Sequence, residues 1–347
     1  MSETQSQKRV MPYVRLGKSG LKVSRIILGC MSYGTSSWQD WVLDEEESMK
    51  HIKAAYDLGI QTFDTANVYS NGHSEIVLGK AIKEYNLPRD EIVVMTKHWF
   101  PVARTQKEIL YNKNVDEYGY VNQHGSSRKH IFESVKHSLE RLQLDYVDVL
   151  QCHRFDGETP IEETMQALHD VVQAGFVRYI GMSSCDAWQY YAITHNLTPF
   201  ISMQNHYNLL YREEEREMMP TLRYFGVGSI PWSPLARGNL SRPFGGETTR
   251  TKSDPWASGY GPSFTKAIID RVEEIAKKRS VSMAQIALAW LLTKDVVSAP
   301  IVGTTSIAKL EDTVKALDIK LTAEEVAYLE EKYEPRAVFG HSSAGGI

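Results

Sequence analysis

The 347-residue sequence predicts a (β/α)8 barrel, an α/β fold in which eight parallel strands alternate with helices. Three observations predict this fold. Short apolar runs of the length of a buried strand occur eight times along the chain. Longer segments with apolar residues at helical spacing lie between these runs. No linker rich in glycine, serine or proline divides the chain, which favours a closed barrel over an open, doubly wound sheet.

A β-hairpin is predicted first, because residues 14–16 and 21–23 flank Gly17-Lys18-Ser19-Gly20, a turn cluster with two glycines. The eight apolar runs follow. They are mostly continuous rather than alternating, as expected of strands that are buried on both faces. They are residues 26–29, 62–64, 92–96, 146–151, 179–182, 200–204, 228–232 and 299–302.

Helical patterns connect the predicted strands. Residues 45–58 carry apolar side chains at helical spacing and stop at Gly59, and residues 161–174 stop at Gly175, which is a common helix C-cap signal. The other connecting helices are predicted at residues 74–85, 128–142, 186–195, 213–225 and 307–317. Extra helices are predicted at residues 264–279, 282–293 and 322–333.

Two predicted connections are long, namely residues 98–126 after the third strand and residues 233–263 after the seventh. Long loops within a compact domain usually have a functional role. Both follow the carboxyl end of a strand, and the active sites of barrels lie at that face. The sequence therefore predicts a functional site beneath these two loops.

Composition bears on organisation and partners. We expect a flexible N-terminal tail at residues 1–11, a single barrel domain at residues 12–333 and a C-terminal tail at residues 334–347.

The net charge of −4 gives no reason to expect nucleic-acid binding, and no apolar stretch is long enough to predict a membrane span. The polar N-terminus does not resemble a secretory signal. Three sparse cysteines argue against a disulfide framework or a thiol metal site and predict a cytoplasmic protein.

Polar side chains stand at the ends of three consecutive predicted strands. Asp64 closes the second strand, Tyr69 follows five residues later, Lys97 closes the third strand and His153 closes the fourth. Neighbouring strands lie about 4.8 Å apart, so these four side chains can converge in one pocket.

The combination suits protonation of an oxygen atom. A lysine ammonium lowers the pKa of a nearby tyrosine, and a carboxylate offsets the cost of burying the lysine. A histidine can orient a carbonyl oxygen on which charge develops. This is half of a carbonyl reduction, and the other half, a hydride, requires a cofactor.

The sequence around these residues resembles the aldo-keto reductase superfamily from about Arg15 to Tyr333. Within the superfamily it is similar to the fungal aryl-alcohol dehydrogenase-like branch, notably in LYRE at residues 210–213 and in the long loop after the seventh strand. The matching motifs are FDTANVYS (63–70), GHSE (72–75), TK (96–97), QCHR (151–154), RYIGMSS (178–184), QNHYNLL (204–210), PWSPLARG (231–238) and PIVGTT (300–305).

The resemblance implies that the barrel has the N-terminal hairpin as a plug at its bottom. It implies a catalytic set of Asp64, Tyr69, Lys97 and His153, in which Tyr69 protonates the substrate oxygen while NADPH delivers hydride. Lys97, held by Asp64, would lower the pKa of Tyr69, and His153 would orient the carbonyl of a small-molecule substrate.

The resemblance also implies an NADP(H) site, although the chain has no G-x-G-x-x-G motif. Trp232 would stack on the nicotinamide, and Ser183 and Gln204 would bind its amide. Lys309 would neutralise a 2′-phosphate, near a predicted helix start that is itself a natural phosphate seat. Relatives commonly have asparagine at Ser184 and arginine at Lys309. The expected cofactor contacts are Gly29, Met31, Asp64, Ser183, Ser184, Gln204, Trp232, Ser233, Leu235, Arg237, Gly238, Gly303, Thr304, Thr305, Lys309 and Asp312.

Aromatic residues that follow the predicted strands either pack within loops or line a substrate pocket, and we assign Tyr33, Trp38 and Trp99 to the pocket. The leading functional hypothesis is NADPH-dependent reduction of aldehydes, preferably aromatic ones, or of ketones to alcohols. Two alternatives stay open: an NADPH-binding regulatory partner similar to channel-associated β subunits, and a reductase dedicated to one fungal secondary metabolite. The sequence predicts neither the oligomeric state nor a metal site.

Overall fold

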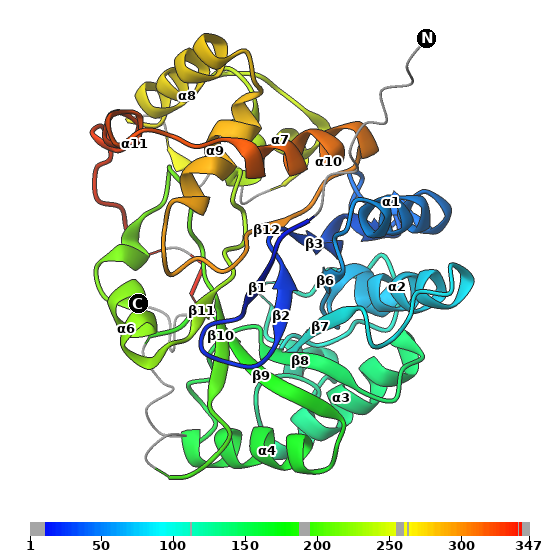
Figure 1. Ribbon diagram of the computed structural model, residues 1–347. Coiled ribbons are helices and arrows are strands. Elements are labelled where there is room, and N and C mark those ends of the chain that lie inside the picture. Colours follow the sequence, from blue (N-terminus) through cyan, green and yellow to red (C-terminus); the bar gives the residue numbers. More distant parts are fainter. Residues whose placement is uncertain are drawn as a thin grey trace.

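Eight strands form one parallel sheet at the centre of the computed structural model (Figure 1). Their order in the sheet is β11-β10-β9-β8-β7-β6-β3-β12, so neighbours in the sequence are also neighbours in space, and all eight predicted strands are confirmed. Their bounds are β3 Ile27–Gly29, β6 Thr62–Asp64, β7 Val93–His98, β8 Val147–Cys152, β9 Val177–Ser183, β10 Phe200–Gln204, β11 Gly228–Ser229 and β12 Ile301–Val302.

The structure describes residues 11–111, 113–186, 195–254, 260–261, 264–338 and 340–341. The helix predicted at residues 186–195 lies outside the described residues except at its two ends. The same holds for nearly all of the predicted N-terminal tail and for the last six residues of the predicted C-terminal tail.

The two terminal strands of the sheet, β11 and β12, are shorter than predicted. Pro231 and Pro300 lie in the predicted runs, and proline has no backbone N–H to donate to a neighbouring strand. Hydrogen bonds nevertheless join these two sheet edges. Ser298 N donates to Ser229 O at 2.8 Å, and Ile301 N donates to Pro231 O at 3.0 Å.

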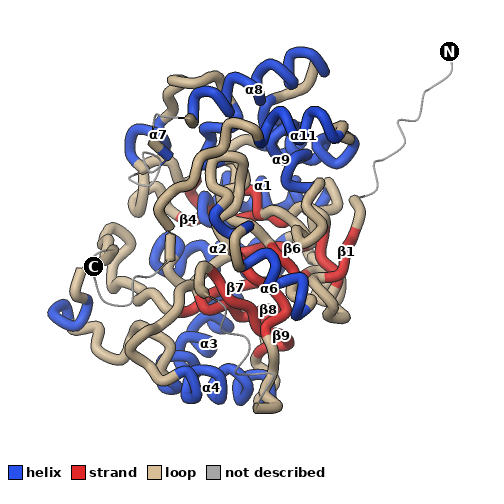
Figure 2. The backbone as a smooth tube through the Cα atoms, turned by 90° about the vertical axis from the view of Figure 1, so that its left-hand side faces the viewer, coloured by secondary structure: helices blue, strands red, loops and turns tan. Residues whose placement is uncertain are grey.

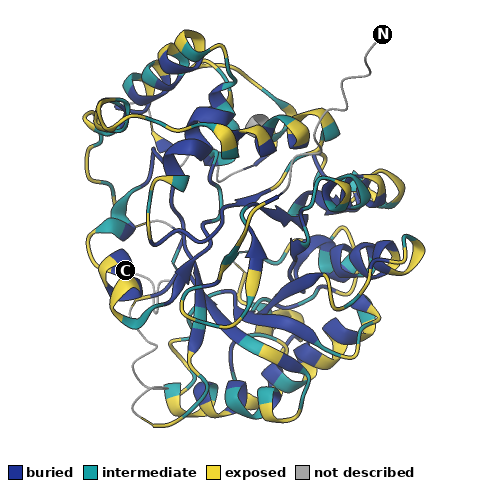
Figure 3. Ribbon diagram, viewed as in Figure 1, coloured by how far each residue is buried: buried dark blue, intermediate teal, exposed yellow. Residues whose placement is uncertain are grey.

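Helices surround the sheet, as Figures 1 and 2 show, and the strands consist mostly of buried residues, whereas the helices carry both buried and exposed ones (Figure 3). Amphipathic spacing gives helices such as residues 128–142 and 161–173 an apolar face that packs toward the strands. The helices are α1 Glu45–Asp57, α2 His73–Glu84, α3 Arg128–Leu142, α4 Ile161–Gln173, α6 Met218–Phe225, α7 Thr249–Ser253, α8 Thr265–Arg279, α9 Met283–Leu292, α10 Ile307–Val314 and α11 Ala323–Glu330.

One predicted helix and one predicted loop need correction. Residues 213–225 form a short 3₁₀ turn, Glu213–Glu215, followed by α6, rather than one helix. Pro220 explains the break, because its ring would clash with the carbonyl four residues earlier in a continuous helix. The predicted loop at residues 233–263 contains α7. A small parallel pair, β4 Tyr33–Gly34 with β5 Leu43–Asp44, was not predicted.

The N-terminal hairpin, β1 Tyr13–Arg15 and β2 Lys22–Ser24, lies in front of the sheet in the view of Figure 1. Gly17 in its turn has φ of +58°, and a Cβ there would lie 2.3 Å from Gly226 O, so only glycine suits this contact. The hairpin contributes Leu16 and Val23 to a separate apolar cluster, here called the plug cluster. Its other buried members are Ile27, Val93, Met95, Val149, Ile230, Ala299 and Ile301.

Candidate active site

A cavity of about 800 Å³ opens at the carboxyl end of the parallel sheet. The last residues of five strands line it: Gly29 of β3, Asp64 of β6, Ser183 of β9, Gln204 of β10 and Val302 of β12. In parallel α/β folds this edge carries the functional side chains, because the connecting loops meet there. The cavity therefore lies where the two long connections predicted it.

A buried ion pair lies at the base of the cavity. Lys97 Nζ donates to Asp64 Oδ2 at 2.6 Å and to the carbonyl of Thr65 at 2.8 Å. Lys97 is fully buried and Asp64 is 2% exposed. Burial lowers the pKa of Lys97, but Asp64 and then Tyr69 raise it, and the net shift is upward. Lys97 is therefore an ammonium at neutral pH.

Two glutamine side chains fix the other oxygen of Asp64. Gln151 Nε2 donates to Asp64 Oδ1 at 3.0 Å, and Gln204 Nε2 donates to the same atom at 2.8 Å. Gln204 Nε2 also lies 3.0 Å from Gln151 Oε1. A carboxylate held from both sides cannot rotate freely, so it keeps Lys97 in one position.

Tyr69 presents its hydroxyl to this ion pair from the start of a 3₁₀ turn, Tyr69–Gly72. Lys97 Nζ lies 3.3 Å from Tyr69 Oη, and Tyr69 lines the cavity. Burial raises the pKa of Tyr69, while Lys97 lowers it and Asp64 raises it; the net shift is upward from 10.0. Lys97 was expected to lower this pKa. It does so, but burial has the larger effect.

His153 lies beside Tyr69, with the two ring centroids 5.7 Å apart in an edge-to-face arrangement. Phe100 packs against His153 at 5.0 Å. Burial, followed by the positive charges of Lys97 and Arg154, holds the pKa of His153 well below 6.5. The imidazole is therefore neutral at neutral pH. The structure thus brings together all four predicted catalytic side chains, three of which line the cavity while Lys97 lies behind them.

Trp232 forms one end of a column of three aromatic rings. Its ring stacks on His206 with centroids 4.1 Å apart, and His206 stacks on Tyr211 at 4.2 Å. Trp232 Nε1 donates to Ser184 Oγ at 3.0 Å. Ser184 is buried and is not among the cavity-lining residues, so it orients the indole ring from behind.

Ser183 and Gln204, which were predicted to bind a carboxamide, are adjacent. Ser183 Oγ donates to the backbone carbonyl of Gln204 at 2.8 Å. The N–H groups of Gln204 are directed to Asp64 and Gln151, whereas the described residues offer no hydrogen-bond donor to its Oε1. Gln204 therefore has an acceptor to offer to a molecule in the cavity.

The loop after β11 borders the cavity with Ser233, Leu235, Arg237 and Gly238. Three non-glycine residues of this loop have left-handed backbone conformations, with φ of 50° at Ser233, 47° at Ala236 and 54° at Arg237. Such a backbone costs free energy and persists where the surrounding structure requires it, often at binding sites.

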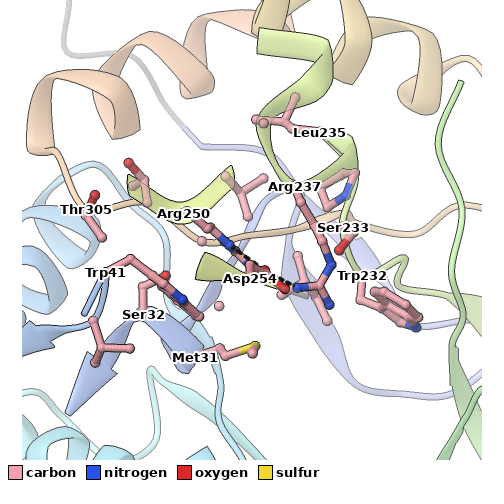
Figure 4. A pocket seen from close by; sticks show the side chains of 18 of the residues that line it. Met31, Ser32, Trp41, Trp232, Ser233, Leu235, Arg237, Arg250, Asp254 and Thr305 are labelled. Atoms are coloured by element: carbon pink, nitrogen blue, oxygen red, sulfur yellow. Dashed lines mark hydrogen bonds and ion pairs between the residues drawn. The ribbon is translucent and has the colours of Figure 1, made fainter. Parts of the chain in front are cut away.

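Arg237 and Arg250 share one carboxylate at the cavity (Figure 4). Arg237 pairs with Asp254, and Arg250 Nε lies 3.0 Å from the same Asp254 oxygen. The Arg250 guanidinium also lies over Trp41, 4.3 Å from the ring centroid. Sequence reasoning did not single out Arg250 or Asp254, because neither lies in a motif and their pairing depends on the fold of the long loop.

The opposite end of the cavity reaches the start of α10. Gly303, Thr304 and Thr305 line it before the helix, and Ser306 caps the helix by accepting from Lys309 N at 3.4 Å. Lys309 and Asp312 line the same end. Asp312 accepts hydrogen bonds from Ser282 Oγ and Gln285 Nε2, each at 2.5 Å, whereas no described residue bonds the Lys309 ammonium.

With Gly29 and Met31, these residues complete the predicted cofactor set; all of it except Ser184 lines the cavity. The residues that were predicted to line the substrate pocket do not line this cavity. Tyr33 is fully buried, with its hydroxyl 3.4 Å from His51 Nδ1. Trp38 packs behind Trp41 and Tyr111, and Trp99 packs edge-on against Phe100 at 4.6 Å.

Other aromatic side chains line the cavity instead, namely Trp41, Phe100, Tyr111 and Trp232. Trp99 and Phe100 lie in a bend directly after β7, and Trp99 has φ of 121°, so the pattern of the strand does not determine the direction of these side chains. Tyr111 lies far along the connection after β7, and no local pattern marked it.

Comparison with known proteins adds independent support. The sequence pattern of the Aldo/keto reductase family matches residues 25–334. Versiconal hemiacetal acetate reductase of Aspergillus parasiticus is 49% identical over 340 residues, covering 94% of this chain and 98% of that protein. A putative aryl-alcohol dehydrogenase of Schizosaccharomyces pombe is 50% identical over 345 residues, covering 94% and 97%.

An aldo-keto reductase of Metarhizium robertsii is 45% identical over 360 residues, covering 99% of this chain and 96% of that protein. These matches confirm the resemblance to fungal aryl-alcohol dehydrogenase-like proteins that the motifs indicated. Within the described residues, no helix is both long and apolar enough to cross a membrane. The family match and the relatives agree with the cavity geometry, and the chain belongs to the aldo/keto reductase family of oxidoreductases.

Proposed function

We propose that this chain reduces aldehydes, preferably aromatic ones, or ketones to alcohols with NADPH, and that Tyr69 donates the proton. The observation that carries the proposal is the Tyr69 hydroxyl, held 3.3 Å from the Lys97 ammonium at the base of an 800 Å³ cavity. We further propose that the parallel sheet closes as a (β/α)8 barrel. The hydrogen bonds between its two edges support closure.

The donor set of the cavity suits NADP(H). Arg237, Arg242, Arg250 and Lys309 line it, and guanidinium and ammonium groups are the usual partners of phosphate oxygens. The Oε1 atom of Gln204 and the exposed face of Trp232 suit a carboxamide-bearing aromatic ring. NADPH, when bound, supplies the hydride.

The proton moves at Tyr69 Oη. The raised pKa keeps the phenol protonated at neutral pH, so Tyr69 has a proton to donate. The Lys97 ammonium stabilises the phenolate that forms, and Asp64 holds Lys97 in place through the 2.6 Å ion pair. Neutral His153 lies beside Tyr69 and donates a hydrogen bond to the carbonyl oxygen, which favours charge developing there.

Trp41, Phe100 and Tyr111, which line the cavity in addition to Tyr69 and Trp232, support a flat, apolar substrate. A second candidate is a reductase dedicated to one secondary metabolite, and the name of the A. parasiticus relative favours it. The two candidates share the same chemistry and differ in substrate. A regulatory NADPH-binding role would show itself as tight binding without turnover.

The test follows NADPH oxidation with a panel of aromatic and aliphatic aldehydes. Replacing Tyr69 by phenylalanine removes only the hydroxyl. We expect kcat/KM to fall by roughly 10²- to 10⁴-fold, the usual contribution of a general acid. The dissociation constant for NADPH should stay within about threefold of the wild-type value, because the cofactor contacts remain.

Tyr224→Phe is the matched control, since Tyr224 is 78% exposed on α6 and should be dispensable. Tight NADPH binding with no turnover of any aldehyde would overturn the general-reductase proposal and favour a dedicated substrate or a regulatory role. Full activity of Tyr69→Phe would show that Tyr69 is not the proton donor.

A further inference from the structure

Arg154 places a positive charge in the cavity next to the proposed proton donor. It follows β8 directly after His153 and lines the cavity together with Tyr69 and Tyr111. Its guanidinium carbon lies 6.0 Å from the ring centroid of Phe100 and 5.9 Å from that of Trp232. The charge is therefore surrounded by aromatic side chains that belong to the same cavity.

Within the part of the chain that the structure describes, no carboxylate pairs with Arg154, and its one hydrogen bond goes to the carbonyl of its neighbour His153. Arg237 in the same cavity is different, because it pairs with Asp254. Arg237 and Arg250 thus share the Asp254 carboxylate, whereas Arg154 has no carboxylate partner among the described residues.

An unbalanced charge of this kind is costly. Burial lowers the pKa of Arg154 to about 10, partly opposed by Tyr69 and Tyr111. The side chain consequently stays protonated at neutral pH while most of its donors lack acceptors. Arg154 is half-buried and lines the cavity, so an anionic group brought there by a ligand would form charge-assisted hydrogen bonds with it.

We propose that Arg154 selects substrates that carry an anionic oxygen, a carboxylate or an acidic phenol, on the same aromatic framework as the reducible carbonyl. The inference rests on the proposed function and narrows its substrate class. Tyr69 and His153 take the carbonyl oxygen, and the neighbouring guanidinium takes the second oxygen. The planar fork of arginine matches a carboxylate with two parallel hydrogen bonds.

The test compares 3- and 4-formylbenzoate with their neutral methyl esters, using wild type, Arg154→Met and Arg154→Lys. Methionine keeps the length of the side chain and removes its charge. For Arg154→Met we expect kcat/KM to fall roughly 10- to 100-fold on at least one formylbenzoate, the effect of losing a charge-assisted hydrogen bond. The methyl esters should change by less than about threefold, and Arg154→Lys should recover part of the loss.

Arg178→Met is the control for loss of a positive charge, because Arg178 is exposed near the amino end of β9, away from the cavity. Its ratio of acid to ester activity should equal that of wild type. An equal loss on acids and esters with Arg154→Met would overturn the proposal and make Arg154 a support for His153.

The anionic oxygen could also belong to the cofactor, so the dissociation constant for NADPH is measured for each variant. A weaker NADPH affinity of Arg154→Met with an unchanged acid-to-ester ratio would assign Arg154 to a cofactor phosphate and overturn the substrate assignment. If wild type reduces none of the aldehydes, the proposed function fails by itself. Calorimetric binding of benzoate against benzamide to wild type and Arg154→Met then decides the Arg154 proposal alone, and equal affinities would overturn it.

Discussion

At the scale of single residues, two opposing effects act on the pKa of Tyr69. Burial raises its pKa, whereas the Lys97 ammonium at 3.3 Å lowers it. The net increase favours the neutral phenol, which is the form that donates a proton. A raised pKa in the folded state stabilises the fold fully below the ordinary value of 10.0, and this stabilisation is lost as the pH rises through the folded-state pKa.

This balance predicts the titration of Tyr69. The difference in tyrosinate absorbance between wild type and Tyr69→Phe should show no ionisation of Tyr69 below pH 10, because burial outweighs the effect of Lys97. Lys97→Met should move any ionisation to still higher pH, since it removes the nearby cation. A Tyr69-dependent transition with a midpoint below pH 10 in the protein without bound molecules would contradict this account.

Sequence reasoning was most successful for side chains that directly follow strands. Asp64 ends β6, Lys97 is the last residue but one of β7 and His153 follows β8, and parallel strands bring such positions together. It was least successful for side chains on long connections. Tyr111 and Asp254 reach the cavity through the path of their loops, which no local pattern encodes. Arg154 lies within the motif QCHR, but only the folded structure shows that no carboxylate of the described residues pairs with it.

At the scale of elements, α10 gives the cavity its second charged end. The helix begins after Ser306, and Lys309 lines the cavity from its first turn. We expect Lys309→Met to weaken NADPH binding by about tenfold or more, because a lost charge-assisted hydrogen bond to the 2′-phosphate has this magnitude. NADH, which lacks that phosphate, should bind with unchanged affinity.

Fluorescence titration of both nucleotides measures the effect, with Lys315→Met as the control. Lys315 is exposed just beyond α10 and does not line the cavity. An equal loss of affinity for NADPH and NADH would show that Lys309 does not read the 2′-phosphate.

Helices with clear local signals were predicted closely. Ser127, Ser282 and Thr322 each cap a helix with the side chain, and the observed starts of α3, α9 and α11 follow them. Residues 213–225 were predicted as one helix, whereas the structure has a 3₁₀ turn and then α6, which has Pro220 in its first turn. The pair β4 and β5 could not be predicted, because two-residue strands carry no periodicity.

At the scale of the whole molecule, the hairpin and the cavity lie at opposite ends of the sheet. The plug cluster contains Leu16, which is fully buried. Leu16→Ala should lower the free energy of unfolding by about 2–5 kcal/mol, the usual cost of such a truncation in a packed core. Unfolding in denaturant measures this change in the free energy of unfolding.

The affinity of Leu16→Ala for NADPH should match that of wild type, because no residue of the plug cluster except Ile301 lines the cavity. Val14→Ala is the control and should lower the free energy of unfolding by less, since Val14 is only partly buried against the same cluster. A loss of affinity without a loss of stability would mean that the hairpin shapes the cavity.

The sequence predicted the number and order of the strands, since each strand is a local apolar run. How the sheet edges meet depends on contacts between residues far apart in the chain, such as Ser229 and Ser298, and these have no local signature. The strand pattern favoured a closed barrel over an open sheet, and the resemblance to a family implied the same arrangement.

The separation of hairpin and cavity has an evolutionary consequence. Substitutions in the loops at the carboxyl edge can alter which molecule is accepted while the plug cluster at the other end keeps the fold intact. Arg154, Tyr111 and Arg250 lie on such loops or directly at strand ends, where a change of side chain leaves the strands unaltered. New substrate preferences can therefore arise here by few mutations, each of which passes through a folded protein.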